Sequence, residues 1–204
     1  QLWRELGGSI TGVTQEGKKP DNARELLQWE SLTLAQIIRD INKYSNNVMA
    51  RQLLMSLTSG PTGTTMTKQA GAARAKSWLA TMGINTQSIV IDNGSGLSRH
   101  ERLSAESLST VLHHEWKSPL MPEFIASLPI VGIDGTMSRS LTHSAVTMQA
   151  HIKTGSLNEV ASMAGYVKAK SGRWISVVCM INHPEANKNR ALFNELLEWI
   201  VERY

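Results

Sequence analysis

The chain has 204 residues, of which 41% are hydrophobic and 19% charged, so it can bury a sizeable core and disorder is not expected. Its net charge is +4, but lysines and arginines are scattered and only 5% of residues are aromatic, which argues against nucleic-acid binding. A solvated surface is the better explanation of the surplus basic residues, although weak attraction to an anionic cell-wall glycan also fits it.

The first 31 residues hold Gly7-Gly8 and a Gly-Lys-Lys-Pro segment at 17–20 between short alternating stretches, a pattern that predicts strands and turns. The sequence opens on Gln1, with neither an initiator methionine nor a signal peptide. We therefore expect an N-terminal part of the protein to precede it.

Four stretches with helical spacing follow. The first has Thr33 as its N-cap, the second runs from about 47 to 57, the third is the alanine-rich stretch 67–82, and the fourth runs from Ser104 to about 117. Ser118-Pro119 begins a shorter helix, with proline at the favoured first helical position.

The last third of the chain changes character. Residues 151–154, 160–168 and 174–182 are predicted strands, and the short turns between them favour an antiparallel meander. An amphipathic helix closes the chain after Pro184. The predicted fold class is α/β (α+β), with a helical cluster, a small antiparallel sheet and a C-terminal helix. Three strands make a thin sheet for this length, so further elements are expected outside the sequence.

Cys179 is the single cysteine and falls in the apolar run 174–181, so a buried strand thiol is expected and a disulfide within the chain is excluded. The six histidines form no His-Glu-x-x-His pattern, and the adjacent His113 and His114 point to different sides of their helix. The sequence thus predicts neither a metal site nor a cofactor. No apolar stretch approaches the roughly 20 residues of a membrane-spanning helix.

Lys153-Thr154-Gly155-Ser156 lies on a predicted strand just before a turn. The backbone of an edge strand can pair with an extended peptide, Lys153 supplies a positive charge, and the Thr154 and Ser156 hydroxyls can hold a terminal carboxylate. Gly155 leaves room for close approach to the backbone. The alternative is a surface strand with a lysine near its turn, and the tetrapeptide alone does not decide between the two.

Ser45-Asn46-Asn47 lies in the polar break between the first two predicted helices, upstream of Lys153. A serine or asparagine here can also serve as a helix N-cap, which is the plainer explanation of a Ser-x-Asn match. In a serine acyltransferase, the Ser45 hydroxyl can pass a proton to the leaving amine, and the Asn47 amide can hold the substrate backbone.

Residues 88–92 alternate as a predicted strand and run into a glycine-rich turn at Asp92-Asn93-Gly94-Ser95-Gly96-Leu97-Ser98-Arg99. The turn lacks the Gly-Lys-Ser/Thr of a phosphate-binding loop and has no dinucleotide-binding spacing. Local hydrogen bonds between side chains and backbone explain most of its composition.

Read in order, these blocks resemble the class C low-molecular-mass penicillin-binding proteins, the DacB-type D-alanyl-D-alanine carboxypeptidase/endopeptidase family. The resemblance covers nearly the whole chain and implies a partial β-lactamase/transpeptidase-like domain. It rests on Ile41-Asn42-Lys43-Tyr44-Ser45-Asn46-Asn47, Asp92 to Arg99, Leu128-Pro129, Gly132-Ile133-Asp134-Gly135-Thr136-Met137, Ala150-His151-Ile152-Lys153-Thr154-Gly155-Ser156-Leu157 and Ala164-Gly165-Tyr166-Val167.

The resemblance assigns roles to the motif residues. Ser45 would be the proton relay in acyl transfer, Asn47 would bind the substrate amide, and Lys153 would support the relay and anchor the substrate. Thr154 and Ser156 would hold the carboxylate of a terminal D-alanine or of its β-lactam mimic.

The resemblance also assigns roles to Gly155 and to the backbone of Ser156. Gly155 belongs to the substrate-binding segment between Thr154 and Ser156. The backbone N–H of Ser156 would form half of the oxyanion hole, and the N–H of the nucleophile would form the other half.

The family's first motif, Ser-x-x-Lys, is absent, since no serine in the sequence is followed by lysine three residues later. Members of the family carry that motif near their N-terminus and insert accessory domains before Ser-x-Asn. The resemblance therefore implies that residues 1–31 are the tail of an inserted accessory domain. Residues 32–204 would be the C-terminal part of the penicillin-binding peptidase domain, and the missing N-terminal part would supply the nucleophile and its general-base lysine.

The implied function is that of a periplasmic serine D-alanyl-D-alanine carboxypeptidase/endopeptidase. It would act on peptidoglycan stem peptides ending in D-Ala-D-Ala and be acylated by β-lactams, while this sequence by itself is expected to be inactive. The alternatives are a serine β-lactamase of the same fold and a non-catalytic peptidoglycan-binding homologue. The blocks at 92–99 and 132–136 favour the peptidase over the lactamase.

Overall fold

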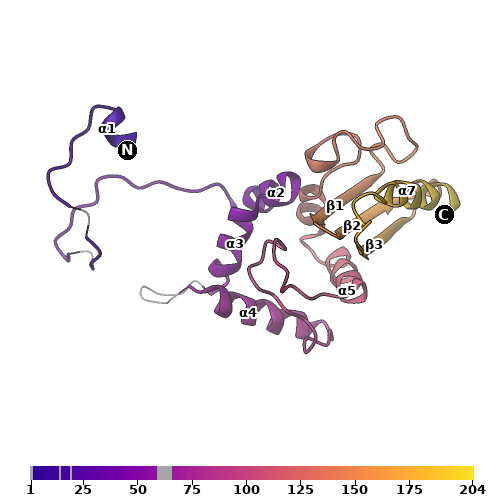
Figure 1. Ribbon diagram of the computed structural model, residues 1–204, viewed down its shortest axis with the longest axis horizontal. Coiled ribbons are helices and arrows are strands. Elements are labelled where there is room, and N and C mark those ends of the chain that lie inside the picture. The colour runs from indigo at the N-terminus through magenta and orange to yellow at the C-terminus, as the bar shows by residue number, and fades with distance from the viewer. Residues whose placement is uncertain (1, 14, 19, 59–65) are drawn as a thin grey trace. The chain divides into compact units, whose positions relative to one another are not determined.

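The computed structural model of the chain describes residues 2–13, 15–18, 20–58 and 66–204. These fall into two compact units, Gln1–Ser31 and Leu32–Tyr204 (Figure 1). The elements in chain order are α1 (Leu2–Glu5), α2 (Leu34–Tyr44), α3 (Asn47–Ser56), α4 (Lys68–Thr81), α5 (Ala105–Trp116), α6 (Met121–Ser127), η1 (Gly135–Met137), β1 (Ala150–Leu157), β2 (Val160–Lys168), β3 (Trp174–Asn182) and α7 (Ala191–Arg203).

In the first unit, the prediction of strands is wrong for the described residues. The chain forms the single helical turn α1 and then irregular structure. Gly7, with φ of 85°, turns the chain after α1, and the Trp3 indole Nε1 donates to the Ser9 carbonyl at 3.4 Å. Alternating stretches this short need a hydrogen-bonded partner strand to become a sheet, and the unit provides none among these residues.

The helices α2 and α5 begin at the N-caps predicted from the sequence, Thr33 and Ser104. Four side chains accept a hydrogen bond from the backbone N–H three residues ahead, as N-caps do. These are Thr33, Asn46, Thr67 and Ser104, which cap α2, α3, α4 and α5. Thr33 completes a capping box with Gln36. The predicted helices are therefore confirmed, with small shifts at their ends.

The shorter helix α6 starts later than predicted. It begins at Met121, and Pro122 rather than Pro119 lies in its first turn. Ser118 instead forms a turn, in which its Oγ accepts from the Leu120 N–H at 3.1 Å and its carbonyl from the Met121 N–H at 3.1 Å. Both prolines satisfy the same local preference, so the sequence could not choose between them.

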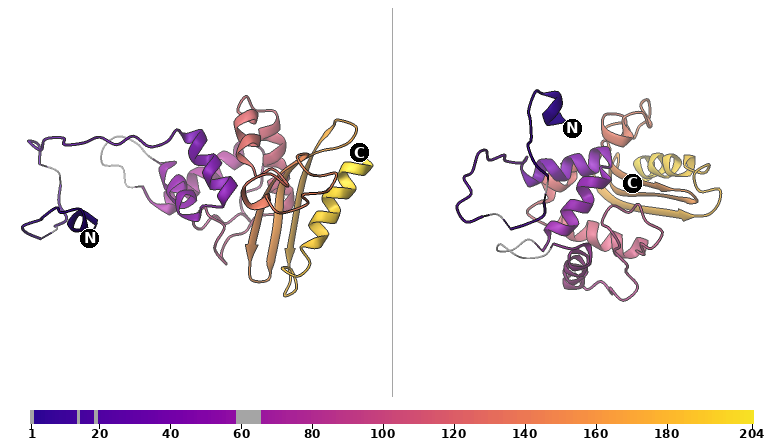
Figure 2. Two further views of the ribbon diagram at one scale, coloured as in Figure 1. Left: turned by 90° about the horizontal axis from the view of Figure 1, so that it is seen from above. Right: turned by 60° about the vertical axis from the view of Figure 1, so that its left-hand side comes forward.

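The predicted antiparallel meander is confirmed. Strands pair in the order β1-β2-β3, with Lys153 opposite Ala164 and Tyr166 opposite Ser176 (Figure 2). The first strand is longer than predicted, because residues 150–157 pair with β2 over their whole length. By contrast, the strand predicted at 88–92 is reduced to a single bridge, in which Val90 and Arg102 exchange backbone hydrogen bonds of 2.9 and 3.0 Å.

The sheet is covered on both faces. On one face, Ile152, Met163 and Val177 form the largest hydrophobic core together with Leu197 and Val201 of α7. On the other face, Tyr166 packs with Leu112 of α5, Leu128, and the partly buried Trp116, Phe124 and Trp174. The lysine of the Lys153 tetrapeptide thus lies on a strand that is packed from both sides. Among the described residues, no helix has the length and hydrophobicity needed to cross a membrane.

Tyr166 carries the first testable prediction. Its side chain is 1% exposed, its hydroxyl donates to the Leu112 carbonyl at 2.6 Å, and burial raises its pKa to about 12. Tyr166→Phe removes this buried hydrogen bond, so we expect the free energy of unfolding to fall by about 0.5–1.5 kcal/mol in urea titrations.

A pH titration of the same variant checks the cause. The tyrosine ionises near pH 10 in the unfolded chain but near 12 in the folded one, so the parent loses stability as pH rises through this window. The phenylalanine variant should lack that loss. Tyr204→Phe, at a tyrosine that is 42% exposed, is the matched control and should leave the free energy of unfolding at neutral pH unchanged.

Candidate active site

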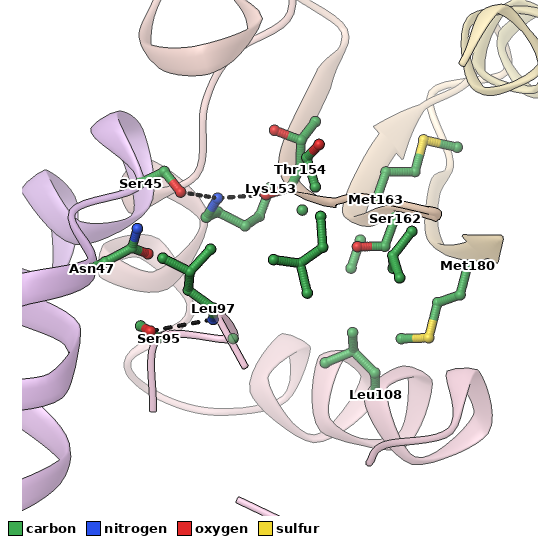
Figure 3. Close-up of a pocket in the computed structure, with 16 residues that line it drawn as sticks. Ser45, Asn47, Ser95, Leu97, Leu108, Lys153, Thr154, Ser162, Met163 and Met180 are labelled. Carbon is green, nitrogen blue, oxygen red and sulfur yellow. Dashed lines mark hydrogen bonds between the residues drawn. The ribbon is translucent and has the colours of Figure 1, made fainter. Parts of the chain in front are cut away.

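A pocket of about 340 Å³ opens between β1, the junction of α2 and α3, and the turn at 95–97 (Figure 3). The residues singled out from the sequence all line it, although they come from two segments far apart in the chain. These are Ser45, Asn47, Lys153, Thr154, Gly155 and Ser156. The structure brings the predicted residues together, and their roles remain predictions.

The junction of α2 and α3 presents Ser45 to the pocket through an unusual backbone. Ser45 has φ of 54° and ψ of 48°, the left-handed conformation that ends α2, and its N–H donates to the Ile41 carbonyl. Asn46 then caps α3 by accepting from the Met49 N–H at 3.1 Å. Because Asn46 takes the capping role, the plainer N-cap explanation does not apply to Ser45 or Asn47, whose side chains line the pocket.

Lys153 connects the two segments. Its Nζ donates to Ser45 Oγ at 3.2 Å, across 108 residues of sequence, and to the Thr154 carbonyl at 2.6 Å (Figure 3). Burial lowers the pKa of Lys153, so its ammonium gives up a proton more readily than that of a lysine in water. An ammonium group can only donate, so Ser45 Oγ is the acceptor in this bond and its own hydrogen remains available to a ligand.

The outer edge of β1 faces the pocket. Its first half is covered, because the Ile152 N–H donates to the Pro129 carbonyl at 2.8 Å and the Val131 N–H donates to the Ala150 carbonyl at 2.9 Å. Backbone N–H groups alternate along an antiparallel strand, so those of Thr154 and Ser156 point to the same side as that of Ile152. There an extended ligand can pair with the strand.

The side chains of the tetrapeptide are held from several directions. Thr154 Oγ1 lies 3.2 Å from Thr136 Oγ1, and Ser156 Oγ donates to Asn187 Oδ1 at 3.3 Å. Gly155 sits over Ser162, whose Oγ would lie 2.5 Å from a Cβ added at this position. A side chain at 155 would thus require the Ser162 hydroxyl to move.

The glycine-rich turn contributes a wall that sequence reasoning did not assign to the site. Asn93 organises it, since its Oδ1 accepts from the Ser95 N–H at 2.9 Å and from the Ser95 hydroxyl at 2.7 Å. The predicted local hydrogen bonds are therefore confirmed. The turn also places Ser95 and Leu97 in the pocket, which only its packing against the rest of the second unit determines.

The far end of the pocket is apolar and was also missed. Leu108 from α5 and Met180 from β3 line it (Figure 3). These residue types are ordinary core residues in sequence, so no local signal marks them as part of a site. The pocket is therefore amphipathic, with hydroxyl, amide and ammonium groups at one end and thioether and aliphatic groups at the other.

Solved structures with the same architecture define the class of the fold. The penicillin binding protein 4 (dacB) of Haemophilus influenzae, solved with a novel β-lactam, superimposes with a TM-score of 0.81 at 27% identity and covers 96% of this chain and 49% of that one. A representative class A β-lactamase from Bacteroides cellulosilyticus matches with a TM-score of 0.57 at 14% identity over 83% of this chain, which shows the fold alone. The predicted β-lactamase-like fold class is confirmed.

The sequence comparison specifies the family. The model of the D-Ala-D-Ala carboxypeptidase 3 (S13) family matches residues 1–201, so the chain belongs to this family. The D-alanyl-D-alanine carboxypeptidase DacB of Haemophilus influenzae is 27% identical over 96% of this chain. The chain spans 44% of that relative's length, somewhat less than half. The resemblance inferred from the motifs is confirmed at the level of the family.

Proposed function

We propose that this chain forms the substrate-docking and proton-relay part of a serine D-alanyl-D-alanine carboxypeptidase/endopeptidase. The observation that carries the proposal is the 3.2 Å contact between Lys153 Nζ and Ser45 Oγ in a pocket walled by the edge strand β1. The substrates would be peptidoglycan stem peptides ending in D-Ala-D-Ala, with β-lactams as acylating mimics. Family membership supports this reading over that of a β-lactamase.

The protons can be followed through the site. In acyl transfer, a nucleophilic serine attacks the scissile carbonyl and the leaving D-alanine needs a proton on its nitrogen. The proton of the nucleophile passes to its base. Ser45 donates its hydroxyl hydrogen to the leaving nitrogen, and the Ser45 oxygen takes a proton from the Lys153 ammonium, which becomes neutral. The lowered pKa of Lys153 favours this transfer. The nucleophile and its base lie outside the 204 residues in this proposal, since the sequence holds no Ser-x-x-Lys.

The peptide substrate would be bound by the backbone of β1 and by the hydroxyl side chains on this strand. An extended peptide pairs with the outer edge of β1, the Asn47 amide binds its backbone, and the Ser156 N–H faces the developing oxyanion. Thr154 and Ser156 then hold the terminal carboxylate beside the ammonium of Lys153, which is a charge-assisted arrangement. The apolar end of the pocket excludes water from the reacting atoms.

The arrangement of the rest of the protein also remains a proposal. We infer that residues 1–31 are the tail of an inserted accessory domain and that 32–204 belong to the peptidase domain, which the separation into two compact units supports. An enzyme acting on peptidoglycan stem peptides has to be exported, and we propose that this one is periplasmic. The missing N-terminal part of the same protein is then a partner of this chain.

Fluorescent penicillin tests the proposed function. We expect the intact protein to give a labelled band on a denaturing gel, and the 204-residue chain alone to give none, because it lacks a nucleophile. A labelled band for the chain alone would contradict the proposal. Release of D-alanine from a stem peptide by the intact protein is the second expected result.

The alternatives give different outcomes in the same assays. Rapid turnover of the bound penicillin, in place of slow deacylation, would identify a serine β-lactamase. Binding of peptidoglycan without labelling or release of D-alanine would identify a non-catalytic homologue.

A further inference from the structure

A buried lysine that the proposed reaction does not use lies two residues before Ser45. Lys43 is 3% exposed, and its Nζ donates to the Leu128 carbonyl at 2.7 Å and to the Asp134 carboxylate at 2.9 and 2.6 Å. These contacts use all three hydrogens of the ammonium. Asp134 Oδ1 also accepts from the Ile130 N–H at 2.7 Å. The ion pair is thus fully hydrogen-bonded on both sides.

The segment from 127 to 136 that contains Asp134 makes contacts with both elements that carry the motif residues, α2 and β1. Toward β1, its residues bond to the backbone of Ala150 and Ile152, and Thr136 Oγ1 lies 3.2 Å from Thr154 Oγ1. Toward α2, the Lys43 pair is joined by Asn42 Nδ2, which donates to Ser127 Oγ at 2.8 Å. The segment therefore acts as a spacer between the strand that carries Lys153 and the helix that ends at Ser45.

The contact between the spacer and α2 is close as well as charged. Gly135 has φ of 56°, and a Cβ added there would lie 2.5 Å from the Lys43 carbonyl oxygen. The backbone after Asp134 thus rests directly on the last turn of α2. A side chain at position 135 would push that turn away from the spacer.

We infer that Lys43 and Asp134 are positioning residues that set the distance between Ser45 and Lys153. Ser45 is a non-glycine residue in the left-handed conformation, which persists only where its surroundings fix it. The ion pair holds the end of α2, immediately before Ser45, against the spacer. The spacer is bonded to β1 in turn, so the position of Ser45 is set relative to that strand. The inference rests on the proposed function only for the chemical role of Ser45.

A gain in the stability of the fold is a poor explanation for the presence of the Lys43–Asp134 ion pair. The Lys43 side chain is 4% exposed and that of Asp134 is 32% exposed, and burial of a charge costs so much hydration that apolar residues of similar size often stabilise a fold equally or better. Unlike apolar residues, the ion pair fixes a position, because two carboxylate oxygens and a carbonyl hold the ammonium at one point. A fixed point is useful where a misplacement of about 1 Å can lower a rate a hundredfold.

The test is a double-mutant cycle in the intact protein with a penicillin as probe. Asp134→Asn keeps the shape of the side chain and the acceptor for the Ile130 N–H but removes the charge. We expect the acylation rate constant to fall roughly ten- to hundredfold, with the noncovalent dissociation constant of the penicillin unchanged. In a Ser45→Ala background the same change should have no further effect on acylation. Additive effects in the cycle would overturn the inference.

A control separates positioning from general destabilisation. Val201 is 2% exposed in α7, on the sheet face away from α5, and Val201→Ala lowers stability without touching the pocket. It should leave the acylation rate constant unchanged. A fall like that of Asp134→Asn would mean that any loss of stability slows acylation, and would overturn the inference.

Amide hydrogen exchange decides the inference independently of catalysis. Asp134→Asn should speed exchange across residues 41–47, where the Asn46 N–H donates to the Ile41 carbonyl at 3.1 Å, while α7 stays protected. Unchanged exchange at 41–47 would overturn the positioning role. An intact wild-type protein that no penicillin acylates would remove the proposed function alone, and the exchange result would still decide the role of the pair.

Discussion

Replacing Lys153 by alanine in the intact protein should lower the acylation rate constant for a penicillin by at least about a hundredfold. The variant loses the ammonium that donates to Ser45 Oγ at 3.2 Å and the positive charge beside Thr154 and Ser156. Preorganised charge of this kind acts on the transition state in a partly dehydrated pocket, where it has a large effect on rate.

Stopped-flow acylation with a chromogenic or fluorescent β-lactam measures this effect. Lys168→Ala is the matched control, because Lys168 is an exposed lysine at the end of β2, away from the pocket. The control should acylate at the parental rate. An unchanged rate for Lys153→Ala would remove Lys153 from the mechanism.

Asp134→Ala should have the largest effect on stability, with a fall of about 3–5 kcal/mol in the free energy of unfolding. The change leaves the ammonium of Lys43, which is 3% exposed, without its counter-ion. Equilibrium unfolding in urea at neutral pH measures the loss. Glu185→Ala, which breaks the exposed pair with Lys188, is the control and should cost no more than about 1 kcal/mol.

The pH dependence of stability follows from the same pair. Burial alone would raise the pKa of Asp134, but the Ile130 N–H and the Lys43 ammonium outweigh it and hold the pKa below its ordinary value. The stabilisation is therefore present above the unfolded pKa of about 3.9 and is lost as pH falls through the lower folded pKa. The difference between the parent and Asp134→Ala should shrink in acid. A difference that stays constant down to pH 2 would contradict this assignment.

The helices show how far local sequence determines this fold. Thr33 and Ser104 cap α2 and α5 as predicted, because an N-cap depends only on a side chain and a backbone N–H three residues ahead. The strands β2 and β3 were likewise predicted with their observed bounds. Where two local signals were equivalent, as with Pro119 and Pro122 before α6, the sequence could not decide which one begins the helix.

Non-local contacts account for what the sequence left out. Leu34, Ile37, Ile38 and Ile41 form the apolar stripe of α2, and at 100° per residue Lys43 lies on the opposite side, where exposure is expected. Lys43 is buried all the same, because Asp134 and the Leu128 carbonyl reach it from a segment more than 80 residues away. No pattern within the helix carries that information.

For the pocket, too, some features follow from local sequence and others only from non-local contacts. The sequence by itself predicted the family and the antiparallel sheet with its flanking helices, and it singled out six motif residues that line one pocket, since these depend on local patterns and on the order of short motifs. Only the tertiary structure decided that Ser45 takes a left-handed backbone 3.2 Å from Lys153, and that Ser95, Leu108 and Met180 complete the walls. The physical reason is that a pocket is made by the distances between segments, and packing across the sheet sets those distances.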